Sequence, residues 1–197
     1  MSYYARITDL DLFGRELTGS YDFDLYENLI KLDCSQNRLT KLEKLPITLE
    51  KLYCNQNQLT HLDISYLINL KELRCSGNII RKLDNLPPNL EILNCSNNDL
   101  KQLDNLPHKL TKLSCQYNDI TNLDNLPYSL ITLNCCENLI TELNNLPINL
   151  IKLNCDNNNI TNLDNLPDSL MKLYCNENPL IYDFDPTLEN IRRSIHL

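Results

Sequence analysis

A unit of about twenty residues recurs along most of this 197-residue chain and constrains its fold more than any other feature. The stretch LPHKLTKLSCQYNDI, which begins at Leu106, returns as LPYSLITLNCCENLI from Leu126 and as LPINLIKLNCDNNNI from Leu146. Numbered from the leucine that follows Leu-Pro-x-x, the unit reads L-x-x-L-x-C-x-x-N-x-(L/I)-T-x-L-D-N-L-P-x-x. Pairs of helices need repeats of about 33 residues or more. The shorter period therefore predicts a solenoid of short strands and turns, in which each unit packs only on its neighbours.

Eight regular units cover residues 29–180, and with the two ends they form one predicted domain over residues 1–197. The second unit contains one extra residue and lacks the Leu-Pro pair, so we expect a local bulge near Ile64 to Tyr66. The units begin at Leu29, Leu49, Leu70, Leu90, Leu110, Leu130, Leu150 and Leu170.

Both ends depart from the repeat and are interpreted as caps, because a terminal unit has only one neighbour to cover its core. Residues 181–197 are expected to form a capping helix over about residues 186–196, with Asp185 as N-cap and Pro186 in the first turn. One further strand, carrying Leu188 and Ile191, is the alternative. Residues 1–28 are interpreted as a degenerate first unit, closed by Tyr3, Tyr4, Phe13, Tyr21, Phe23 and Tyr26.

Two polar positions of the unit are expected to support the fold. Side chains alternate along a strand, so the cysteine at position six faces inward with the leucine at position four. No C-x-x-C pair provides the common zinc spacing, and a free cysteine packs as a small hydrophobe. We expect a column of buried thiols, with a metal or redox column as the competing interpretation, and expect Cys136, at position seven, to be the reactive thiol. Asparagine at position nine can both donate and accept, and so can bridge successive units.

The back of each unit is expected to lack a long helix. Proline fixes φ and has no N–H, and the residue before it avoids the helical region. The Leu-Pro pair therefore predicts extended, polyproline-like backbone or a single 3-10 turn. Position fifteen is mostly acidic and is interpreted as a solvated turn rather than a calcium ladder; it comprises Glu43, Asp63, Asp84, Asp104, Asp124 and Asp164.

Composition excludes several functions. A net charge of −8 disfavours nucleic acid, whose affinity for proteins depends on lysine and arginine meeting phosphates. No apolar run approaches the roughly 18–20 residues that span a bilayer, and the first residues have no signal-peptide apolar core, so we expect a cytoplasmic protein. The chain has no nucleophile elbow, phosphate-binding loop or H-E-x-x-H motif. We therefore expect no catalytic activity, no cofactor and no metal.

The outward positions of the strands are the only positions that are free to vary from unit to unit and so to determine what the protein binds. Position three is rich in lysine, while position five holds amides and a few tyrosines. This pattern either keeps an exposed sheet soluble or forms a docking surface for an acidic segment of a partner protein; tyrosine and arginine are favoured at binding hot spots. The predicted contact residues are Lys31, Lys51, Tyr53, Arg74, Lys112, Tyr117, Lys152, Lys172 and Tyr174.

The L-x-x-L-x-C-x-x-N-x-L core, with its preceding Leu-Pro, resembles leucine-rich repeats, specifically the short Leu-Pro repeats of secreted bacterial effectors. The Asn-rich, Ala-poor composition is also similar to leucine-rich-repeat proteins of giant viruses. The resemblance implies a right-handed solenoid with a concave parallel sheet and a convex side with little helix. It also implies a protein-protein interaction module, binding a partner such as a host-cell protein. A structural, homodimeric component is the alternative.

Overall fold

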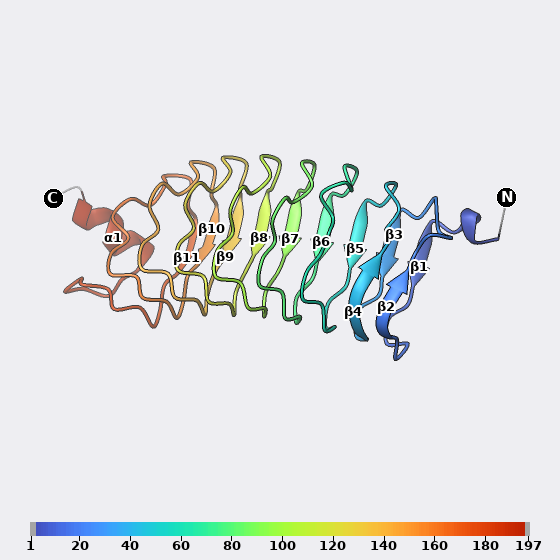
Figure 1. Cartoon of the computed structure of the whole chain (residues 1–197). Helices are drawn as coiled ribbons and strands as arrows, with labels where there is room; N and C mark the ends of the chain where they lie inside the picture. The colour runs from blue at the N-terminus through green and yellow to red at the C-terminus, as the bar shows by residue number, and fades with distance from the viewer. Residues whose placement is uncertain (1–2, 196–197) are drawn as a thin grey trace.

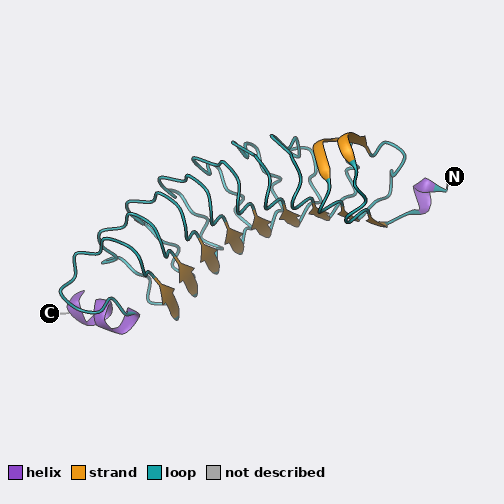
Figure 2. Cartoon of the chain, turned by 90° about the horizontal axis from the view of Figure 1, so that it is seen from below, coloured by secondary structure: helices purple, strands orange, loops and turns teal. Residues whose placement is uncertain are grey.

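The computed structural model describes residues 3–195 and shows one curved solenoid, in which the strands lie along the inner side of the arc (Figures 1 and 2). The strands of this sheet are all parallel, and each pairs with the same repeat position of the next unit. The predicted leucine-rich-repeat fold is therefore confirmed. Over the described residues the sheet contains, in order, β1 (Asp9–Asp11), β3 (Lys31–Asp33), β5 (Lys51–Tyr53), β6 (Glu72–Arg74), β7 (Ile92–Asn94), β8 (Lys112–Ser114), β9 (Thr132–Asn134), β10 (Lys152–Asn154) and β11 (Lys172–Tyr174).

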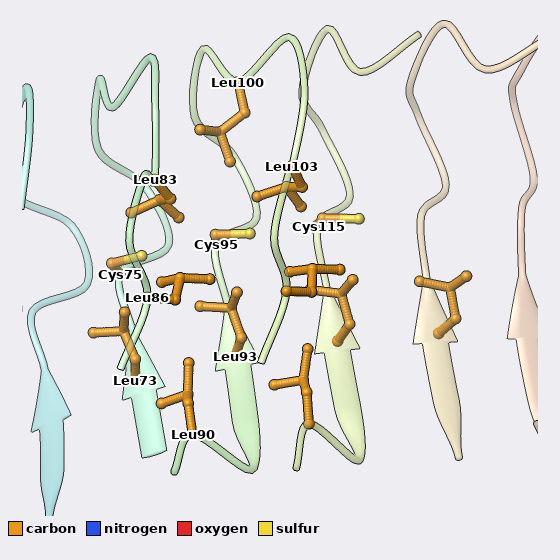
Figure 3. Packing of buried hydrophobic residues seen from close by; sticks show 14 of the residues in the cluster. Leu73, Cys75, Leu83, Leu86, Leu90, Leu93, Cys95, Leu100, Leu103 and Cys115 are labelled. Carbon is orange, nitrogen blue, oxygen red and sulfur yellow. The ribbon is translucent and has the colours of Figure 1, made fainter. Parts of the chain in front are cut away.

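The core is a stack of leucine and cysteine side chains that runs the length of the arc. Figure 3 shows part of this stack. Leu90, Leu93 and Cys95, from one unit, have no exposed surface. Burying a leucine contributes roughly 1.5–3 kcal/mol, and an isolated unit offers no neighbour to bury it. In the regular units these strands are three residues long and cover positions three to five. The expected column of buried free thiols is confirmed.

The asparagine at position nine joins neighbouring units. The amide nitrogen of Asn118 donates to the carbonyl oxygens of Cys115, at 3.0 Å, and of Cys95 in the preceding unit, at 3.1 Å. Its side-chain oxygen accepts the backbone N–H of Leu100 at 3.0 Å. The predicted bridge is thus confirmed, and it repeats at Asn37, Asn57, Asn78, Asn98, Asn138, Asn158 and Asn178.

The convex side of the regular units is extended backbone with tight turns, as predicted. A turn after each Leu-Pro is closed by bonds such as Leu90 N–H to the Pro87 carbonyl, at 3.2 Å. The extra residue of the second unit lies in a turn that Leu67 N–H closes on the Ile64 carbonyl at 3.0 Å. The degenerate N-terminal unit and the first regular unit differ from the prediction: extended segments β2 (Thr18–Asp22) and β4 (Arg38–Glu43) lie side by side and form a second, two-stranded parallel sheet.

The N-terminal cap uses fewer aromatic side chains than expected. Phe23 and Tyr26 are buried and close the core, whereas Tyr3 and Phe13 are 77% and 48% exposed. Tyr4 packs edge-on against Tyr26, with ring centroids 5.5 Å apart. The assignment of Tyr3 and Phe13 to the core edge was therefore wrong. Tyr3 precedes a 3-10 turn, η1 (Tyr4–Arg6), in which Ala5 is buried.

The C-terminal cap is the helix α1 (Leu188–Ile195), so the alternative of a further strand is wrong. The helix begins two residues later than predicted, because the hydroxyl of Thr187, not Asp185, accepts the Asn190 N–H at 3.2 Å. Ile191 is fully buried against the last unit. Residue 196, which the prediction included, lies outside the described residues. Among residues 3–195, no helix has the length and apolarity needed to cross a membrane.

Candidate interaction surface

Parallel pairing arranges the outward side chains of the sheet into two columns. The register aligns Lys112 with Thr132, Lys152 and Lys172 at position three, and Ser114 with Asn134, Asn154 and Tyr174 at position five. Between the two columns, the leucines at position four point inward; Leu113, Leu133 and Leu153 are buried, and Leu173 at the end of the sheet is half-buried. Position three is thus a continuous outward row, as the alternation of a strand requires.

In the N-terminal half of the sheet, the predicted contact residues pair with acidic side chains of this chain. Lys31 Nζ lies 3.1 Å from Asp9 Oδ2. Glu72 is the centre of a larger group: it is only 7% exposed, and Arg74 Nε lies 2.7 Å from its Oε1. The hydroxyl of Tyr53 donates to Glu72 Oε2 at 3.1 Å, and Lys51 Nζ lies 4.0 Å from the same oxygen.

The group around Glu72 is a compact polar cluster rather than a row of free cations. The Arg74 guanidinium carbon lies 5.2 Å from the centre of the Tyr53 ring, within cation–π range. Burial, together with the hydrogen bond to Glu72, raises the pKa of Tyr53 above its usual value. Lys51, Tyr53 and Arg74 are therefore brought together, but around an acid of this chain.

The C-terminal half of the sheet presents cations without acidic partners. Lys112, Lys152 and Lys172 are exposed, and none of them takes part in an ion pair between the described residues. Lys152 Nζ lies 5.6 Å from the centre of the Tyr174 ring, which is itself 43% exposed. These four side chains form what we call the lysine row, over β8 to β11.

Amides at position five have a structural task that the sequence reasoning missed. The side-chain oxygens of Asn94, Asn134 and Asn154 each accept the backbone N–H two residues further on, at 3.1, 3.4 and 3.1 Å. This Asx turn ends the strand. Asp33 makes the same turn, and that shared geometry explains why short Asx side chains dominate the column.

Tyr117 lies beside the two columns rather than in them. It occupies position eight, after β8 has ended, with a left-handed φ of 56° and 57% exposure. Left-handed backbone recurs at this position in every regular unit and was not predicted, although Gly77, Asn97 and Asn157 at the same position were a signal for it. Tyr117 can therefore reach a ligand only at the edge of the sheet.

A second feature that sequence reasoning missed is a row of exposed apolar side chains at position two, next to the lysine row. Ile131, Ile151 and Met171 are 41%, 41% and 73% exposed. Simple alternation would place position two inward, but the strand begins only at position three, and leucines one and four already fill the core. We call these three residues the apolar ridge.

The cysteines do not form a reactive centre. Burial raises the pKa of Cys34 and Cys75 to about 12. Cys136 is half-buried, and its pKa is raised by burial and by the nearby carboxylates of Asp156 and Glu137. Within residues 3–195, no three His, Cys, Asp or Glu side chains are grouped so that they could hold a metal ion.

These features define a leucine-rich-repeat protein: parallel strands on a concave face, an asparagine bridge between units and a convex side of turns. Its repeats are of the type found in bacterial effector proteins. YopM from Yersinia enterocolitica WA-314 is 37% identical with a TM-score of 0.76, over 79% of this chain and 34% of that one. The functional domain of InlJ from Listeria monocytogenes, which includes a cysteine ladder, is 32% identical with a TM-score of 0.67, over 92% and 46%.

A leucine-rich-repeat domain of a Shigella effector is 27% identical with a TM-score of 0.59, over 97% of this chain and 76% of that one. The chain thus spans about a third of the YopM structure and less than half of the InlJ structure. No protein-family model matches the chain. None of the curated proteins matches its sequence.

Proposed function

We propose that this chain is a protein-interaction module without catalytic activity, which binds an acidic segment of a partner protein through the C-terminal half of its concave face. The observation that carries the proposal is the lysine row. On a chain of net charge −8, Lys112, Lys152 and Lys172 are exposed and have no acidic partner within residues 3–195, while Lys31, Lys51 and Arg74 are paired. Three aligned cations attract an acidic segment and disfavour a basic one.

The remaining predicted contacts take supporting roles in this proposal. Within the lysine row, Tyr174 is the aromatic anchor, and Tyr117 contacts the partner at the sheet edge. The remaining predicted contacts touch the partner only where it displaces the carboxylates that now pair with them, Asp9 and Glu72. These contacts are Lys31, Lys51, Tyr53 and Arg74. The Shigella neighbour is an effector, which supports a host-cell protein as partner.

The free thiols support location in a reducing compartment, and we propose the cytoplasm. For a secreted or viral protein this is the cytoplasm of the host cell. Described cysteines are all unpaired, a state that reducing compartments maintain. A giant-virus origin stays a prediction from composition. We assign the surface no role with nucleic acid or membranes.

The test is a titration with a fluorescent peptide of consecutive glutamates. We expect salt-sensitive binding that the Lys112→Glu, Lys152→Glu, Lys172→Glu variant loses by at least tenfold. The matched control is Lys31→Glu, Lys51→Glu, Arg74→Glu, three reversals in the paired half, which should lose less than threefold. Equal losses in both variants would contradict the proposal.

Self-association is the second candidate, favoured by complementary charge on the chain itself. The acidic row at position fifteen, including Asp84, Asp104 and Asp124, is exposed on the convex side. A second copy could place this row on the lysine row. Light scattering that shows only monomer at millimolar concentration and low salt would exclude this candidate.

A further inference from the structure

We infer that the partner segment is an amphipathic helix lying across β8 to β11, with an acidic stripe on the lysine row and an aliphatic stripe on the apolar ridge. The inference rests on the proposed function and adds the chemistry and shape of the ligand. Its basis is the adjacency of two chemically different rows: Ile151 precedes Lys152, and Met171 precedes Lys172, on neighbouring strands.

Exposed apolar side chains occupy position two of three consecutive units only in the half of the sheet that carries the unpaired lysines; in the other half, Ile30 stands alone. At position two of the preceding units, Glu50 and Lys71 pair with each other at 2.9 Å, so this part of the row is charged and satisfied. The ridge begins at Ile131 and is 73% exposed at Met171. Unpaired cations and exposed apolar side chains therefore coincide on one surface.

Apolar surface continues from the ridge toward the loops that lead into the strands. Tyr128 and Ile148 are 80% and 70% exposed there. They line a hollow of about 750 Å³ together with Leu126 and Leu146, and polar residues, among them Asp124, line the rest of it. Aliphatic side chains of a ligand on the ridge thus find further apolar contacts on the side away from the lysines.

The spacing of the strands selects a helix over an extended segment. Neighbouring strands lie about 4.8 Å apart, and a helix rises about 5.4 Å per turn. From Lys112 to Lys172 there are three strand intervals, about 14 Å, against about 16 Å for three helical turns. Side chains on one face of an extended peptide repeat every 6.6–6.8 Å or so, about 20 Å over three repeats. A helix therefore stays in step with the lysines, and a strand does not.

The test uses two alanine-based helical peptides of about 20 residues, long enough to hold helix. Both have glutamates at i, i+4, i+7 and i+11. In the first, a leucine follows each glutamate directly, which places the two stripes side by side. In the second, each leucine stands two positions after its glutamate, which places it on the opposite face of the helix. Composition and charge are identical.

We expect the adjacent-stripe peptide to bind at least tenfold more tightly than the opposite-face peptide. The Ile131→Ser, Ile151→Ser, Met171→Ser variant should abolish that difference while still binding both. The control variant Ile30→Ser with Ile68→Ser, exposed isoleucines of the N-terminal half, should preserve it. Thermal unfolding would show that each variant is folded.

The outcomes separate the inference from the proposed function. Equal binding of the two peptides by the unmodified protein, or a difference that survives in the ridge variant, overturns the helix inference. If the Lys112→Glu, Lys152→Glu, Lys172→Glu variant still binds both peptides more weakly than the unmodified protein, the proposed function stands without the helix inference. If that variant weakens neither peptide, both proposals are wrong.

Discussion

Arg74 and Glu72 lie two residues apart on β6, and the arginine Nε is 2.7 Å from the carboxylate Oε1. This carboxylate also accepts from Tyr53, so one acidic residue engages the cations and tyrosine that surround it. Glu72 thereby neutralises the cations around it in the N-terminal half of the concave face. The lysine row, in the C-terminal half, keeps its cations unpaired among the described residues.

Replacing Glu72 with glutamine should free Arg74 and Lys51 for an external acid. We expect the glutamate peptide to bind severalfold more tightly and the free energy of unfolding to fall by about 1 kcal/mol, a small loss because both cations are half-exposed. Titration and urea unfolding measure the two effects. Glu50→Gln, which frees only Lys71, is the control. Unchanged peptide affinity in Glu72→Gln would show that the acid does not mask this half.

Removing one asparagine bridge should be costly. Asn118→Ala leaves the Leu100 N–H, inside the stack, without its acceptor. It also removes one of two donors from the Cys95 carbonyl, which keeps the Asn98 amide. At about 1–3 kcal/mol for an unsatisfied buried group, we expect a loss of roughly 2 kcal/mol in urea unfolding. Asn122→Ala, at an exposed position, should change stability by less than about 0.5 kcal/mol. Similar losses from both would contradict the bridging role.

Buried thiols should make the fold sensitive to alkali. Thiols of the unfolded chain ionise above about pH 9, whereas burial holds the pKa of Cys34 and Cys75 at about 12. Folded and unfolded states keep these protons below pH 9. As pH rises toward 12 only the unfolded state loses them, so the free energy of unfolding falls.

Seven cysteines have no exposed surface, and together they give a slope of up to roughly 10 kcal/mol per pH unit. Cooperative unfolding is therefore expected between about pH 9.5 and 11, given a stability of about 5–15 kcal/mol. Circular dichroism against pH measures it. The Cys95→Ala, Cys115→Ala variant should release about two fewer protons on unfolding. A fold that is equally stable at pH 8 and pH 11 would refute this account.

Cys136 should be the one cysteine that a thiol reagent modifies in the folded protein. It is half-buried with a raised pKa, so the reaction should be slower than with a free thiol. We expect one modified thiol per folded chain and nine after denaturation, measured by mass spectrometry. Cys136→Ser should remove the native reaction entirely. Rapid modification of several thiols in the native state would mean that the stack opens.

The repeat predicted the core in detail, because burial and strand alternation act on each position separately. Leucines, cysteines and the asparagine bridge follow from residue type and spacing alone. Contacts around Glu72 could not be predicted, since they depend on how the side chains of Arg74, on the same strand, and Tyr53, on the neighbouring strand, turn toward it. Ile131, Ile151 and Met171 were missed because the start of the strand decides whether position two faces in or out. The Thr187 cap shows the usual uncertainty at a helix end.

The most direct measurement is to map the bound glutamate peptide on the backbone by nuclear magnetic resonance. At 22.9 kDa the chain is suited to amide shift mapping. We predict that the largest shifts fall on β8 to β11, centred on Lys152, with small changes on β3 to β6. Shifts centred on Lys31 to Arg74, or spread evenly along the arc, would contradict the assignment of the site to the lysine row.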